Sequence, residues 1–150
     1  MTRTARAAIR ILLVALASAA TPLQAEQFVR AGRFEIHYNA FHADAVPAEV
    51  AAAHGIARSR NRGLVNVTVL APQASGIAQS AEASVSGSVV NLAGQRQPLD
   101  FRAVREADAL YYLAEFPIAG EDRYRFTLAV HPAGASREET IRFEQPLVGR

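Results

Sequence analysis

The sequence predicts an all-β protein: an antiparallel, immunoglobulin-like β-sandwich of about seven strands with one short crossover helix. Apolar and polar residues alternate along short segments, which is typical of strands that bury one face. Turn-forming residues separate these segments at intervals of roughly 8–12 residues, as expected of a sandwich. Beyond the N-terminal region, only one segment has a helical pattern.

The first 25 residues are predicted to be a cleaved signal peptide, which leaves residues 26–150 as a single β-sandwich domain. Three arginines precede the apolar run 11–20, which is too short for a stable transmembrane anchor. We expect cleavage after Ala25 or, as a second choice, after Ala20. A buried N-terminal helix is the alternative. The prediction is therefore a periplasmic protein with no membrane insertion after cleavage.

Composition excludes several classes of function. Residues 26–150 carry 13 arginines and 14 acidic residues, a net charge of −1 with neutral histidines, so we expect no nucleic-acid partner. The chain has no cysteine, which excludes a disulfide framework, a catalytic thiol and a lipoprotein anchor. It also has no lysine, which excludes a Schiff base and a Walker phosphate loop.

The strands follow from the alternation. In segment 32–41, Phe34, Ile36 and Tyr38 share one face, and three valines of segment 64–70 do the same. Segment 109–116 is apolar on both faces, which predicts a central strand. The predicted strands are 32–41, 64–70, 83–92, 99–104, 109–116, 124–130 and 140–148.

Aromatic residues are assigned mainly to the core by the same pattern. Tyr111 and Tyr112 lie on opposite faces of one strand, so one of them is expected to reach a surface. The predicted inward-facing residues are Phe34, Tyr38, Phe101, Phe126 and Phe143.

One short helix is predicted within residues 46–56. Pro47 suits the first helical position, and Gly55 suits a left-handed stop that returns Ile56 onto Val50 or Ala51. We expect this helix to cross between the sheets or to lie at one end of the sandwich.

Four blocks, in order and spacing, carry a family resemblance: "FEIHYNAF", "HGIARSRNRGLVNVTVL", "NLAGQ" and "DALYYLAEFPI". Over residues 34–143 the chain resembles a family of small exported bacterial proteins that is catalogued only as a domain of unknown function. The resemblance implies a secreted β-sandwich. It supplies no catalytic residue.

An arginine stripe, defined as Arg58, Arg60 and Arg62, precedes the second predicted strand. If this segment is extended, the three side chains share one side at a spacing of about 7 Å and could bind a carboxylate or phosphate. Alternatively, they pair with nearby acids at the rim of the sheet. With Asn61, the stripe is the predicted contact surface for a partner or an anion.

Three further residues, His37, His42 and Asp44, offer imidazole and carboxylate groups that would suit zinc or Cu(II). The spacing is unfavourable, because His37 and His42 are five residues apart and point to opposite faces of a regular strand. This set is therefore the basis of an alternative function, a small-ligand or metal-binding periplasmic carrier.

No catalytic residue and no cofactor are predicted. The serines of "SVSGS" lack the strand–turn–helix context of a nucleophile elbow, and Glu106 and Asp108 lie in a polar turn. The sequence favours a non-enzymatic interaction or accessory module. It is expected to bind another envelope protein through a sheet edge or the rim that carries the arginine stripe. The identity of that protein and the oligomeric state stay open.

Overall fold

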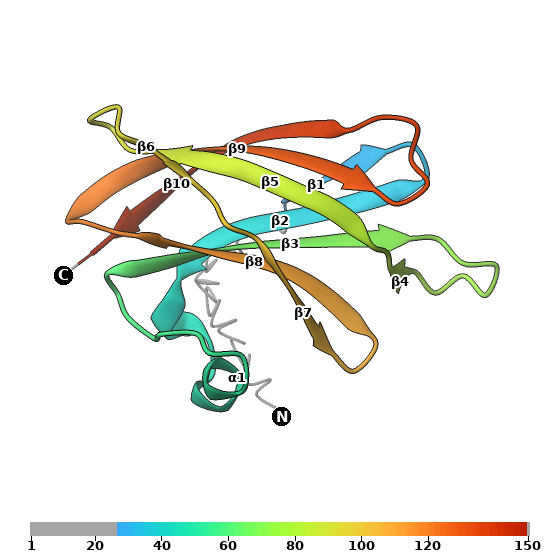
Figure 1. The fold of residues 1–150 in the computed structure, drawn as a ribbon, viewed down its shortest axis with the longest axis horizontal. Helices are drawn as coiled ribbons and strands as arrows, with labels where there is room; N and C mark the ends of the chain where they lie inside the picture. Colours follow the sequence, from blue (N-terminus) through green and yellow to red (C-terminus); the bar gives the residue numbers. More distant parts are fainter. Residues whose placement is uncertain (1–26, 150) are drawn as a thin grey trace, which may run out of the picture.

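A computed structural model describes residues 27–149, which form two antiparallel sheets packed face to face (Figure 1). The predicted signal peptide lies outside the described residues. Sheet A has the order β1-β2-β3-β8-β7, with β4 paired to β3, and sheet B has the order β10-β9-β5-β6. The strands of sheet A are β1 (Gln27–Ala31), β2 (Phe34–His42), β3 (Arg62–Ala71), β4 (Gln79–Ser80), β7 (Arg102–Glu106) and β8 (Ala109–Pro117). Those of sheet B are β5 (Ala83–Val90), β6 (Arg96–Pro98), β9 (Glu121–Pro132) and β10 (Glu139–Val148).

The predicted antiparallel sandwich is confirmed, and each of the seven predicted segments contains a strand. Three short strands were not predicted: β1, β4 and β6 have five, two and three residues. Such lengths give too few alternations to stand out from a turn or loop. The predicted central strand is β8, which lies between β3 and β7.

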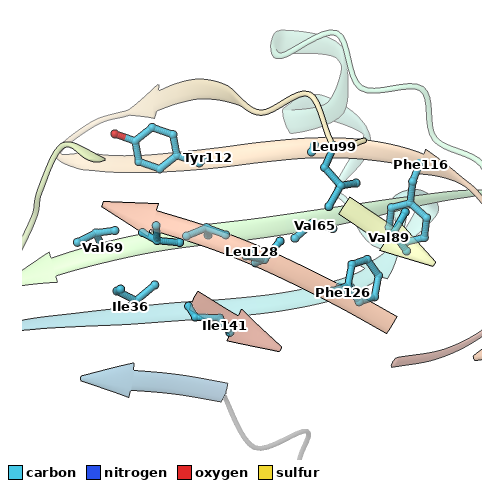
Figure 2. Packing of buried hydrophobic residues seen from close by; sticks show 14 of the residues in the cluster. Ile36, Val65, Val69, Val89, Leu99, Tyr112, Phe116, Phe126, Leu128 and Ile141 are labelled. Atoms are coloured by element: carbon cyan, nitrogen blue, oxygen red, sulfur yellow. The ribbon is translucent and has the colours of Figure 1, made fainter. Parts of the chain in front are cut away.

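The main core lies between the two sheets (Figure 2). Val65, Val67 and Val69 of β3 are fully buried there, and they face Leu128 and Val130 of β9 across the sandwich. The five aromatic residues predicted to point inward all belong to this cluster or pack against it. The alternation seen in the sequence therefore places the core correctly.

One close backbone contact lies within sheet B, and one hydrogen bond joins the two sheets. Gly87 of β5 lies opposite Leu128, and a Cβ at Gly87 would stand 2.6 Å from the backbone oxygen of Thr127, so only glycine fits. Tyr112 points inward from β8, and its hydroxyl accepts a hydrogen bond of 2.7 Å from the backbone N–H of Ala83 in β5. A polar bond thus joins the sheets within an otherwise apolar interior.

The predicted helix is present as α1 (Ala48–Ala53), preceded by the 3-10 turn η1 (Ala43–Ala45). Gly55 has a φ of 64°, and the backbone N–H of Ile56 donates to Ala51, as the sequence predicts. The helix connects β2 and β3, which are neighbours in sheet A, and so does not cross between the sheets. It lies on the side of sheet A that faces away from sheet B (Figure 1).

Within residues 27–149, no helix combines the length and apolar character needed to cross a lipid bilayer.

Candidate functional site

The arginine stripe does not form one extended segment. Residues 60 and 61 form a turn, and β3 begins only at Arg62. The backbone N–H of Arg62 donates to the carbonyl of Ser59 at 3.3 Å, and that of Asn61 donates to the Ser59 hydroxyl at 3.1 Å. The expected alignment of three arginines on one side therefore fails, because the chain reverses direction before the strand starts.

Each arginine of the stripe has an acidic residue as a partner. Arg58 donates to the backbone oxygen of Asp44 at 2.9 Å, and the guanidinium of Arg60 lies 3.7 Å from the Asp44 carboxylate. Arg62 forms an ion pair of 2.9 Å with Glu115 of β8. These exposed contacts tie the η1 segment and β8 to the start of β3, which is the rim arrangement that the sequence offered as an alternative.

The residues of the metal alternative lie in different surroundings. His37 points outward from β2, stacks on the ring of Phe28 at 5.4 Å and lies 3.6 Å from Glu35. His42 Nδ1 lies 3.1 Å from the backbone oxygen of Arg60, and the Asp44 carboxylate lies 3.7 Å from the guanidinium of the same arginine. Within residues 27–149, no three His, Asp or Glu side chains are grouped so that they could hold a metal ion. The structure therefore does not assemble His37, His42 and Asp44 into a site.

A different feature stands out on the outer face of sheet A. The outer face of a two-layer sandwich is usually polar, since it meets water. Here Leu64 of β3 is fully buried under α1, in a second apolar cluster with Ala43, Val46, Ala51 and Ile56. Since α1 has only six residues, it covers just part of this apolar surface.

The uncovered part is a pocket of about 310 Å³, which we call the recess. Apolar side chains of the η1–α1 segment form one wall, and strands β2, β3, β7 and β8 form the floor and the other wall. Its lining residues are Phe41, Ala45, Val46, Pro47, Val50, His54, Ile56, Leu64, Asn66, Val104, Glu106, Tyr111 and Leu113.

Few polar groups enter the recess. The Oδ1 atom of Asn66 is buried and has no hydrogen-bond partner in the described part of the chain. His54, at the end of α1, lies 3.9 Å from the carboxylate of Glu106 on β7. Tyr111 lines the recess while Tyr112 points into the core, so the prediction that one of the two reaches a surface is confirmed. The recess thus offers mainly apolar contact.

The recess borders a free edge of sheet A. Strand β7 is the last strand of its sheet, and its Val104 and Glu106 line the recess. Val104 lies opposite Tyr111 in the ladder with β8, so the apolar lining reaches the edge itself. The recess could not be predicted from the sequence, because its residues span positions 41 to 113. The signal that was available is the apolar outer face of segment 109–116.

These features define a class of protein: a two-sheet antiparallel β-sandwich with an apolar recess on one outer face. A family model described as a domain of unknown function, DUF4426, matches residues 28–148, and the chain belongs to that family. The resemblance found in the sequence is thereby confirmed.

The chain is also similar to several solved structures. A DUF4426 family protein from Pseudomonas aeruginosa is 34% identical, with a TM-score of 0.72, over 85% of this chain and 98% of its own. FetP from uropathogenic Escherichia coli strain F11, isolated after expression in the periplasm, is 17% identical with a TM-score of 0.59, over 83% and 95% of the two chains. A copper-bound variant of FetP with one Glu-to-Gln substitution is 16% identical with a TM-score of 0.56, over 84% and 97%. No curated protein matches the chain. At this identity the likeness to FetP concerns the fold alone.

Proposed function

We propose that this protein is a non-enzymatic interaction module of the periplasm that binds an extended segment of another envelope protein. The observation that carries the proposal is the position of the apolar recess beside the free edge strand β7. The periplasmic setting rests on the predicted signal peptide. The sequence led us to expect a contact at a sheet edge or at the arginine stripe. We retain the sheet edge and propose the recess, in place of the arginine stripe, as the surface beside it.

An edge strand has unpaired backbone N–H and C=O groups on one side, and an extended peptide can pair with them. The five residues of β7 would accept a segment of about 17 Å. Both β7 and the longer edge strand β10 carry charged residues, but β10 also contains Pro146, which cannot donate to a ladder. The other edge of sheet A, β1, contributes no residue to the recess. Strand β7 contains no proline, and apolar surface lies next to it.

The recess would supply specificity. In a strand added beside β7, alternate side chains point to the outer face of sheet A, where Val104 already points. Burial of one Leu- or Phe-sized side chain contributes about 1.5–3 kcal/mol.

Site-specific photo-crosslinking in the periplasm of the native host tests the proposal. A photoreactive residue replaces Ala45, which is exposed and lines the recess, or Ala133, which is exposed in the turn between β9 and β10 at the far end of the sandwich (Figure 1). We expect a discrete protein adduct from position 45 and none from position 133. Adducts of equal yield from both positions, or none from position 45, would overturn the proposal.

A matched pair of substitutions in α1 tests whether the recess is responsible for the adduct from position 45. Val50→Arg places a charge in the recess, whereas Ala52→Arg places the same charge on the exposed side of α1. We expect only Val50→Arg to abolish the adduct from position 45. Circular dichroism of both variants checks that the sandwich remains folded.

A small-ligand carrier is the second candidate. The volume of the recess, about 310 Å³, lies at the lower end of the range for ligand pockets. The copper-bound FetP variant shares the fold. Native mass spectrometry of the purified protein with zinc or Cu(II) tests the metal-binding form of this candidate, which the sequence placed at His37, His42 and Asp44 outside the recess. One tightly held ion, lost in His42→Ala, would favour a carrier over an interaction module.

A further inference from the structure

We propose that the outer face of sheet B carries a phosphate-binding site formed by Arg96, Arg125 and Arg142. These residues come from β6, β9 and β10 and line one hollow of about 390 Å³. The site lies on the sheet opposite the recess and is independent of the proposed function. No sequence motif indicated it, because the three arginines are far apart in the chain.

The strand register brings the three side chains to one place. Arg125 lies opposite Val90 of β5, and Arg96 lies opposite the same Val90 from the other side. Arg142 lies opposite Thr127, one outward position along β9 from Arg125. Arg125 lies between the other two: its Cα is about 10 Å from that of Arg96, two strands away, and about 7–8 Å from that of Arg142 on the diagonal, whereas Arg96 and Arg142 are about 16 Å apart. Arginine side chains are long enough to line one hollow from these positions.

The charges of these arginines are poorly compensated. Arg30, Arg62 and Arg105 each form an ion pair with a glutamate. Glu144 lies directly opposite Arg125 in the ladder between β9 and β10, but among the described residues neither Arg125 nor Arg142 has a carboxylate within ion-pair distance.

Arg96 donates only to the Ser88 hydroxyl, at 2.6 Å. Residues 27–149 carry 12 arginines and 13 acids, a net charge of −1, yet the hollow is lined by three arginines and one acid. A local excess of positive charge on a weakly acidic molecule favours an anionic ligand.

The number of donors points to phosphate and away from a carboxylate. One guanidinium can satisfy both oxygens of a carboxylate through a bidentate pair. Three guanidinium groups supply more donors than two oxygens need, and the outward Thr127 and Ser88 add hydroxyl groups beside them. A phosphate group presents three or more oxygens in different directions, which matches donors from three strands.

The single acid of the hollow gives the proposal a second, opposite test. The carboxylate of Glu144 lies 3.5 Å from Arg123, which partly neutralises it, and Glu144 also lines the hollow. A negative charge at this position opposes an anionic ligand. Its removal should therefore strengthen binding of phosphate.

Titration of the full chain with inorganic phosphate, followed by amide chemical shifts, tests the site. We expect shifts grouped on β5, β9 and β10. Replacement of Arg125 and Arg142 together by glutamine should weaken binding at least about tenfold, since charge-assisted hydrogen bonds are lost. As a control, two arginines outside the hollow, Arg58 and Arg137, are replaced together by glutamine, and this change should leave phosphate binding unchanged.

Glu144→Gln should tighten binding, a result that loss of folding cannot produce. The proposal would be overturned if the Arg125→Gln, Arg142→Gln protein bound phosphate as tightly as the unchanged protein. It would also be overturned if Glu144→Gln bound phosphate more weakly.

The source of the phosphate is decided by a parallel experiment with vesicles. Phosphatidylglycerol vesicles are compared with vesicles of zwitterionic phosphatidylcholine in a co-sedimentation assay. Binding of free phosphate assigns the site to a soluble phosphate or phosphomonoester. Binding to phosphatidylglycerol vesicles alone, lost in the double arginine variant, assigns it to a lipid headgroup. Failure to bind either probe would overturn the site itself.

Discussion

The two sides of β3 bury apolar residues in opposite ways. On the inner side, Val65, Val67 and Val69 are covered by sheet B and have no exposed surface. On the outer side, Leu64 is covered by a two-turn helix, and the apolar surface continues into an open recess. The same strand thus contributes to a closed core on one side and to an open apolar recess on the other.

This contrast also extends to the polar groups. The hydroxyls on the inner side have partners: that of Tyr112 is hydrogen-bonded to the other sheet, and that of Tyr124 accepts from the backbone N–H of Ala119. The outer side contains Asn66 Oδ1, a buried acceptor without a partner among the described residues. Buried polar atoms in stable interiors are normally satisfied, so the two sides of β3 differ in their polar groups as well as in their apolar packing.

The largest expected effect is a difference in the free energy of unfolding between two matched leucine substitutions, one in each apolar cluster. Leu128→Ala in the closed core should lower the free energy of unfolding by about 4 kcal/mol, since the cavity cannot collapse. Leu64→Ala should lower the free energy of unfolding by only about 2 kcal/mol, because the space left by the deleted side chain joins the open recess. Both leucines have 0% exposure, so burial alone predicts equal losses. Urea unfolding measures both, with the exposed Leu92→Ala as the control; equal losses would contradict the contrast.

A smaller effect is expected from the polar groups. Tyr112→Phe leaves the N–H of Ala83 without its partner and should cost about 1–2 kcal/mol. Asn66→Leu removes an unsatisfied acceptor, so it should leave the free energy of unfolding unchanged or raise it by up to about 1 kcal/mol. Urea unfolding of both variants is the measurement. A large loss for Asn66→Leu would show that this side chain is structural.

The smallest effect concerns the rim that joins the outer cluster to the sheet. Replacement of Arg60 and Arg62 by serine removes exposed ion pairs to Asp44 and Glu115, each worth less than about 1 kcal/mol. We expect the melting temperature, measured by circular dichroism, to change by only a few degrees. A loss comparable to that of Leu64→Ala would mean that these arginines hold the η1–α1 segment in place.

Much of the fold could be predicted from the sequence because its signals are local. The valines of β3 and the left-handed Gly55 act through their immediate neighbours, so alternation and turn chemistry identified them. The same holds for the orientation of Tyr111 and Tyr112, which depends only on the period of a strand.

The binding surfaces could not be predicted in this way, since they depend on strand register. The recess requires Leu113 to lie opposite Asn66, and the phosphate site requires Arg142 to lie one outward position from Arg125. Neither relation is encoded within a single segment. The arginine stripe was prominent in the sequence because its members are adjacent, although each of them contacts an acid of this chain.

The connection through η1 and α1 has a consequence for how this scaffold can diversify. His42 and Gly63 are already paired at the end of the β2–β3 ladder, so the two ends of the intervening excursion are held together by the sheet. Doubling the length of such an excursion costs only about 0.6 kcal/mol in closure entropy. One wall of the recess can therefore be lengthened, shortened or exchanged between homologues while the sandwich beneath it remains intact, which lets specificity change independently of folding.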